Sequence, residues 1–71
     1  MKRVDVVSSC LCSVGYCSES RVLEVEFKSG CVYRYEGVSL EEHAALMAAQ
    51  SLGRWFNAGI KPHFDGRRVR S

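Results

Sequence analysis

The chain has 71 residues, of which 46% are hydrophobic and 25% are charged, and its formal net charge is +2. A chain of this length forms one domain at most and buries only about 60% of the surface that its unfolded form exposes. No apolar run approaches the roughly 18 residues of a membrane span, and no apolar signal core follows the first residues. We therefore expect a cytoplasmic protein.

Charge is unevenly distributed along the chain. Residues 51–71 hold five of the ten Lys and Arg residues but only one of the eight Asp and Glu residues. Such asymmetry indicates either a polyanionic partner or a solvated basic end that aids solubility. Composition alone leaves both interpretations open.

Four cysteines, Cys10, Cys12, Cys17 and Cys31, are conspicuous in so short a chain. Their spacing lacks the Cys-x2-Cys pairs that are typical of zinc sites. Without a secretory signal, free thiols are the expected state. We interpret the cysteines as small side chains that suit strands, and we predict no metal and no cofactor.

The first half of the chain has strand patterns. Residues 1–7 either start a strand or stay mobile as a lead-in. The first clear strand is predicted at residues 10–16, and Gly15 within it indicates a bulge or a close approach of another segment. After a turn, a β-hairpin follows with arms at residues 21–28 and 31–36.

The register of this hairpin depends on the length of its loop. A two-residue turn at residues 29–30 would pair Val25 with Arg34, whereas a three-residue loop at residues 28–30 pairs Val25 with Tyr33. A slip of one residue moves a whole set of side chains to the other face. We choose the three-residue loop because it gathers the large apolar side chains on one face.

This choice has two consequences for the hairpin. Gly30 must adopt the left-handed conformation that such loops require, and Glu24 faces Arg34 across the strands. Tyr33 and Tyr35 then point toward the core rather than toward solvent.

The second half of the chain has helix patterns. Ser39 with Glu42 three residues later forms a capping box, and the helix that follows is predicted to run to about residue 49. His43 lies on its apolar side and is interpreted as a packed histidine. Ser51 is predicted to cap a shorter helix at residues 52–58.

These elements predict an α+β fold: a three-stranded antiparallel β-meander followed by one main helix and one short helix, both packed on one face of the sheet. The single domain covers residues 8–64. Residues 1–7 precede it as a lead-in, and residues 65–71 follow as a basic, flexible tail.

Several motifs together resemble the KTSC domain family, a small domain found at the C-terminus of some lysyl-tRNA synthetases and as stand-alone bacterial proteins. The resemblance covers roughly residues 8–64 and is carried by Ser8-Ser9, by Tyr33-Arg34-Tyr35 and by Ser51-x-Gly53-x-x-Phe56-Asn57. It implies a small α+β domain and, through the synthetase association, an RNA-binding role, and it brings no catalytic residues. We interpret the family motif residues as structural: Tyr33, Tyr35, Ser51, Gly53 and Phe56.

Two functional hypotheses remain for this small, non-catalytic module. The first is RNA binding, for which exposed aromatic and cationic side chains are required; the candidates are Arg54, Trp55, Asn57, Lys61, Arg67, Arg68 and Arg70. The second is interaction with another protein or with itself through an open sheet edge. Catalysis is not expected, because no nucleophile–base arrangement and no Gly-rich phosphate loop occurs.

Overall fold

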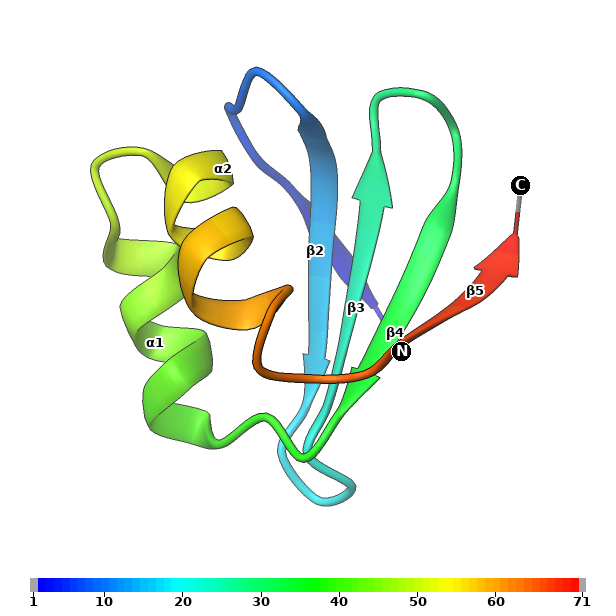
Figure 1. Cartoon of the computed structure of the whole chain (residues 1–71), viewed down its shortest axis with the longest axis vertical. Helices are drawn as coiled ribbons and strands as arrows, with labels where there is room; N and C mark the ends of the chain where they lie inside the picture. Colours follow the sequence, from blue (N-terminus) through cyan, green and yellow to red (C-terminus); the bar gives the residue numbers. More distant parts are fainter. Residues whose placement is uncertain (1, 71) are drawn as a thin grey trace.

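A computed structural model describes residues 2–70 of the chain, which form a curved sheet with helices on one side (Figure 1). The strands are β1 (Arg3–Asp5), β2 (Leu11–Cys17), β3 (Val22–Phe27), β4 (Val32–Glu36) and β5 (Gly66–Arg70). The helical elements are α1 (Leu40–Ala48), α2 (Leu52–Trp55) and the π-helical turn η1 (Phe56–Ile60). All neighbouring strands are antiparallel, in the order β1-β2-β3-β4-β5.

The α+β class is confirmed, but the prediction of three strands is wrong, because the sheet has five. The added strands come from the segments interpreted as a lead-in and as a flexible tail. Val4 of β1 pairs with Val14, and Arg67 of β5 pairs with Arg34. Both added strands are short edge strands with mostly polar or charged side chains. They form through backbone pairing with a neighbouring strand, and their sequences lack the apolar alternation that predicts a strand.

The predicted hairpin register is confirmed. Val25 pairs with Tyr33, Leu23 pairs with Tyr35, and the backbone N–H of Phe27 donates to the carbonyl of Cys31 at 2.9 Å. Gly30 has a φ of +99°, a conformation that side-chain-bearing residues rarely adopt. The loop length inferred from apolar patterning is therefore the loop length in the structure.

The bulge in β2 does not lie at Gly15. The irregularity in β2 falls between Leu11 and Ser13, whereas Gly15 pairs regularly with Arg3 on one side and Glu24 on the other. The Arg3 guanidinium reaches the Glu24 carboxylate at 2.6 Å. Because Gly15 lies between Arg3 and Glu24 in the strand order, this ion pair crosses β2 at Gly15.

Both helices begin as predicted, with Ser39 before α1 and Ser51 before α2. At α1, the Glu42 N–H donates to Ser39 Oγ at 3.1 Å and the Ser39 N–H donates to the Glu42 carboxylate at 3.0 Å, which completes the capping box. Ser51 occupies the N-cap position of α2, although its side chain makes no capping hydrogen bond to the helix. α2 continues directly into η1, whose wide turn closes with a 2.9 Å hydrogen bond from the Lys61 N–H to the Phe56 carbonyl.

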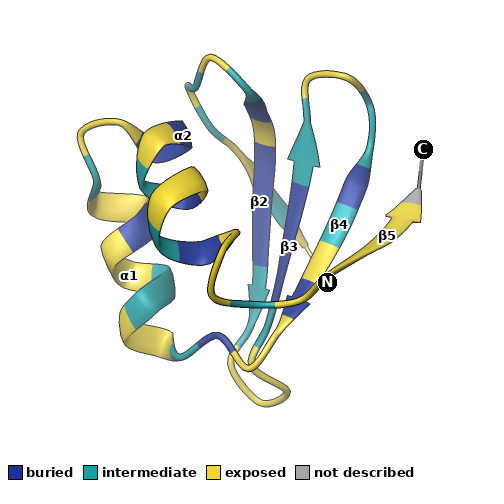
Figure 2. Ribbon diagram, in the orientation of Figure 1, coloured by how far each residue is buried: buried dark blue, intermediate teal, exposed yellow. Residues whose placement is uncertain are grey.

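The hydrophobic core lies between the helices and the facing side of the sheet (Figure 2). Leu23 and Val25 of β3 meet Leu46, Phe56 and Ile60 from the helical layer, and all five are completely buried. The helical segment 52–60 is thus held by core side chains, and its remaining side chains are available at the surface.

Candidate functional site

The two tyrosines of the family motif belong to the core. Tyr35 is 3% exposed, and its ring meets Phe56 edge-on with centroids 5.4 Å apart. Burial, and then the neighbouring Tyr33, raise the pKa of the Tyr35 phenol. Tyr33 is half-buried and packs edge-on against Phe27 at 5.6 Å. Tyr35 is therefore part of the core, and Tyr33 lies at the edge of the core with part of its surface accessible.

The outer face of the sheet centres on a buried carboxylate. Glu24 is 6% exposed and lies between Arg3, at 2.6 Å, and Arg34, at 2.7 Å. Burial raises the pKa of Glu24, but the hydrogen bond from Arg34 and the charge of Arg3 outweigh burial and hold the pKa below its ordinary value. Next to it, the Ser13 hydroxyl donates to Glu26 at 2.8 Å. Arg34, although exposed, is therefore already engaged by an anion.

A surface ridge on the helical segment brings polar and aromatic groups together. Ser51, Arg54 and Ala58 follow one another at helical spacing, and we call these three residues the α2–η1 ridge. Two hollows adjoin it, and all three ridge residues line both. The polar hollow, of about 440 Å³, is completed by Ser9, Cys10, Gly53 and Asn57. The apolar hollow, of about 430 Å³, is completed by Ala49, Gln50 and Trp55.

The polar hollow exists because two distant segments approach closely at Gly53. A Cβ added at Gly53 would lie 2.8 Å from both Cys10 Sγ and Ser8 Oγ. Ser8 shapes that loop, since its Oγ accepts hydrogen bonds from the backbone N–H groups of Cys10 and Leu11, each at 3.3 Å. Gly53 therefore allows this close approach, which a larger side chain would obstruct.

Sequence reasoning did not place Ser9 and Cys10 in the site. The signal that points to them is the Ser8-Ser9 pair among the residues that resemble the family, because it precedes β2 on the loop that meets Gly53. Their part in the hollow depends on a contact between segments more than forty residues apart in the sequence.

Trp55 lines the apolar hollow with part of its ring. The indole covers the backbone at Gly59, where an added Cβ would lie 3.0 Å from the ring. The side chain is half-buried, and its accessible part also lines a smaller hollow of about 270 Å³ with Ala58 and Gly59. Arg54 is exposed and makes no ion pair within residues 2–70. An accessible aromatic surface thus lies beside an uncommitted cation.

The predicted nucleic-acid residues fall into two groups. Arg54, Trp55 and Asn57 belong to the ridge and its hollows, and Lys61 is exposed just after η1. The arginines Arg67, Arg68 and Arg70 belong to β5, the strand at the edge of the sheet away from α2 (Figure 1). Arg67 lines a separate hollow of about 540 Å³ together with Arg34, Glu36, His63, Phe64, Asp65 and Gly66.

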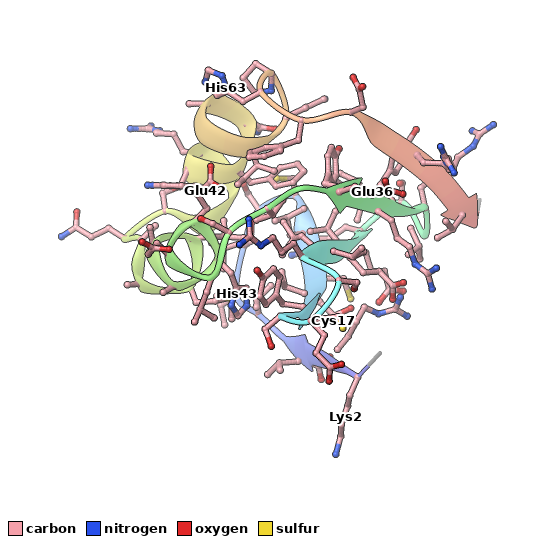
Figure 3. The ribbon with its side chains drawn as sticks, turned by 90° about the horizontal axis from the view of Figure 1, so that it is seen from below. Lys2, Cys17, Glu36, Glu42, His43 and His63 are labelled. Carbon is pink, nitrogen blue, oxygen red and sulfur yellow. The ribbon has the colours of Figure 1, made fainter. Side chains whose placement is uncertain are left out.

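The histidines do not form a joint site. His43 stacks on the Tyr16 ring, with centroids 4.5 Å apart and planes at 8°, and burial lowers its pKa. Its packed position agrees with the sequence-based interpretation. His63 is exposed on the turn after η1, well apart from His43 (Figure 3).

The cysteines are free thiols in the structure. A side-chain hydrogen bond with Ser20 lowers the pKa of Cys17. Within residues 2–70, no three His, Cys, Asp or Glu side chains are grouped as metal ligands would be. Over the same residues, no helix has the length and apolarity needed to span a membrane.

Comparison with known proteins identifies the family. Residues 7–64 match the KTSC domain. The chain belongs to the KTSC domain family. A crystal structure of a KTSC domain protein from Yersinia pestis superimposes with a TM-score of 0.92 at 38% sequence identity, covering 96% of both chains.

Two relatives extend the comparison to sequence. An uncharacterised protein of Stutzerimonas stutzeri is 56% identical over 70 residues, which cover 97% of this chain and 99% of the relative. A protein of Tsukamurella paurometabola is 37% identical over 59 residues, which cover 83% of this chain and 88% of the relative. The KTSC fold is therefore shared along nearly the whole chain with both the Yersinia and Stutzerimonas proteins.

Proposed function

We propose that this KTSC domain is a cytoplasmic, non-catalytic module that binds single-stranded RNA through the α2–η1 ridge and its two hollows. The observation that carries the proposal is the exposed, unpaired Arg54 beside the accessible part of Trp55. Single-stranded nucleic acids are bound by cations that meet phosphates and by aromatic rings on which bases stack.

The two hollows suit the two parts of a nucleotide. The apolar hollow offers the Trp55 ring to a base, and Arg54 on the ridge is placed to meet the adjoining phosphate. In the polar hollow, the Ser9 hydroxyl and the Asn57 amide supply hydrogen-bond donors and acceptors for a sugar hydroxyl or a phosphate oxygen.

Other surfaces are less suited to this role. Tyr35 is buried and cannot stack with a base. On the outer face of the sheet, Arg34 is engaged by Glu24, and Glu26 and Glu36 add further negative charge. Because Arg3 and Arg34 are already paired with Glu24, they are less free to meet a phosphate, which favours the ridge as the RNA-binding surface.

The test is a titration with an oligouridylate. Trp55 is the only tryptophan in the chain, so its fluorescence reports directly on stacking at the ridge. We expect quenching on RNA addition, and an affinity that falls steeply between low and moderate salt because phosphate contacts release counterions. Absence of both quenching and salt-dependent binding at low salt would disprove the proposal.

Variants locate the site. Arg54→Ala should weaken binding and reduce the slope of log K against log salt by about 0.7, the contribution of one phosphate contact on a single strand. Lys2→Ala is the matched control, because it removes one exposed positive charge beside a different hollow, which no ridge residue lines. An equal loss of affinity in both variants would indicate attraction to net charge and no defined site.

A further inference from the structure

The outer edge of β5 presents backbone groups without a partner. Within residues 2–70, β5 pairs with β4 alone. Successive residues of a strand direct their backbone N–H and carbonyl groups alternately toward one neighbouring strand and toward the other. Cys31 accepts a hydrogen bond from Phe27 N–H and therefore faces β3. Arg34, three residues later, thus directs its N–H and carbonyl toward β5, where Arg67 is its partner. The N–H and carbonyl groups of Gly66 and Arg68 therefore point away from the sheet.

This edge is also strongly positive. Arg67 faces Arg34 across the β4–β5 pair, an arrangement of like charges that is unfavourable unless an anion lies nearby. Glu24 engages Arg34 at 2.7 Å, but neither Arg67 nor Arg68 has a carboxylate partner among the described residues. Arg67 and Arg68 are both exposed, and they lie on opposite faces of the strand.

The two features together favour one kind of partner. Unpaired backbone groups repeating along a strand match an extended peptide, and the surrounding arginines require that peptide to carry carboxylates. A second copy of the chain pairing through β5 would set arginine against arginine. Nucleic acid is the less suitable partner, because it cannot pair as a strand with these backbone groups. Of the two rings opposite β5, Tyr35 is buried and Tyr33 is only half-buried.

The edge has an apolar component as well. Val69 has no residue opposite it in β4, because the register shifts between Val32 and Tyr33, and it is 44% exposed. A partner strand that alternates acidic and apolar side chains therefore fits the edge better than a uniformly acidic one.

We propose that the outer edge of β5 binds an extended acidic segment of another protein, which adds to the sheet as a sixth strand. This site is separate from the α2–η1 ridge and does not depend on RNA binding there. The proposal assigns a function to the arginines of β5, which lie outside the α2–η1 ridge.

The test uses a fluorescein-labelled Glu-Val-Glu-Val-Glu-Val peptide with blocked ends. We expect saturable binding by anisotropy at low salt. Amide hydrogen exchange should slow at Gly66 and Arg68, whose N–H groups point outward, and stay unchanged at Arg67, whose N–H already faces β4. A control peptide in which proline replaces valine has the same charge but cannot pair as a strand.

Each outcome decides the proposal. Because the glutamates of this peptide all lie on one face of the added strand, one of the two variants Arg67→Glu and Arg68→Glu should weaken peptide binding by at least about tenfold, the effect of 1.4 kcal/mol. Lys28→Glu, the same charge change away from the edge, should have a much smaller effect. Equal binding of the proline peptide, unchanged exchange at Gly66 and Arg68, or no binding at about 1 mM peptide would each overturn strand addition. Loss of oligouridylate binding in Arg67→Glu, with peptide binding intact, would assign this edge to nucleic acid instead.

Discussion

The two faces of the sheet bury their central side chains to nearly the same extent, by opposite means. On the helix-covered face, Val25 is completely buried among apolar side chains. On the outer face, the neighbouring Glu24 is only 6% exposed, although no helix covers it. Its cover is provided by Arg3 from β1 and Arg34 from β4, whose side chains close over the carboxylate from both sides.

This comparison shows how a small domain uses both surfaces of one sheet. The apolar face gains stability from the removal of hydrocarbon from water. The outer face replaces hydration of a carboxylate by two charge-assisted hydrogen bonds, which join β1, β3 and β4. Such a face holds the sheet together, and the charges of Arg3 and Arg34 are already committed to Glu24.

The largest effect is expected on the helix-covered face. Tyr35→Ala should lower the free energy of unfolding by about 3–5 kcal/mol, the usual cost of truncating a large buried aromatic side chain. Urea denaturation measures this loss. Tyr33→Ala should cost less because Tyr33 is only half-buried. If Tyr35→Ala left the free energy of unfolding nearly unchanged, Tyr35 would not be a core residue. The Tyr-x-Tyr pair would then again be a candidate for binding.

A smaller effect is expected on the outer face. Glu24→Gln should lower the free energy of unfolding by about 2 kcal/mol, because two hydrogen bonds lose their charge and two arginines lose their anion. Glu19→Gln is the control, since Glu19 is exposed in the β2–β3 turn. Similar stability of both variants in urea would show that the Arg3–Glu24–Arg34 contacts contribute nothing beyond those of a surface charge.

The same carboxylate predicts an acid dependence. Because the folded-state pKa of Glu24 is lowered, its stabilising contribution is complete above the unfolded-state pKa of about 4.3 and is lost as the pH falls through the lower folded-state value. The free energy of unfolding of the wild type should therefore fall below that pH more steeply than that of Glu24→Gln. Parallel pH profiles would contradict the lowered pKa.

The smallest effect concerns His43 at the edge of the helical layer. Burial lowers its folded-state pKa, so its neutral form stabilises the fold fully above the unfolded-state pKa of about 6.5, and this contribution is lost as the pH falls toward the folded-state value. His43→Gln should remove a shallow decrease in stability between neutral and mildly acidic pH. Nuclear magnetic resonance titration should show His43 with a pKa below the ordinary histidine value of about 6.5; a pKa at or above that value would contradict the prediction.

The candidate site was predictable only in part. Arg54, Trp55 and Asn57 were identified because they lie close together in a cationic part of the sequence, and the structure places them around one ridge. Arg67 and Arg68 belong to the same basic stretch, but they lie in β5, at the edge of the sheet away from α2. The two groups of residues are close in sequence but far apart in space, because the chain passes from the helical layer to the sheet between them.

Local patterns in the sequence by themselves determined the β3–β4 register, the capping box of Ser39 with Glu42, and the inward direction of Tyr35. These features depend on neighbours a few residues away, where alternation and hydrogen-bonding geometry act directly. Only the tertiary structure decided that the chain ends of residues 2–70 join the sheet as β1 and β5, that an ion pair crosses Gly15, and that Gly53 admits the Ser8–Cys10 loop. Those features depend on contacts between distant segments, which form only when the core has brought the segments together.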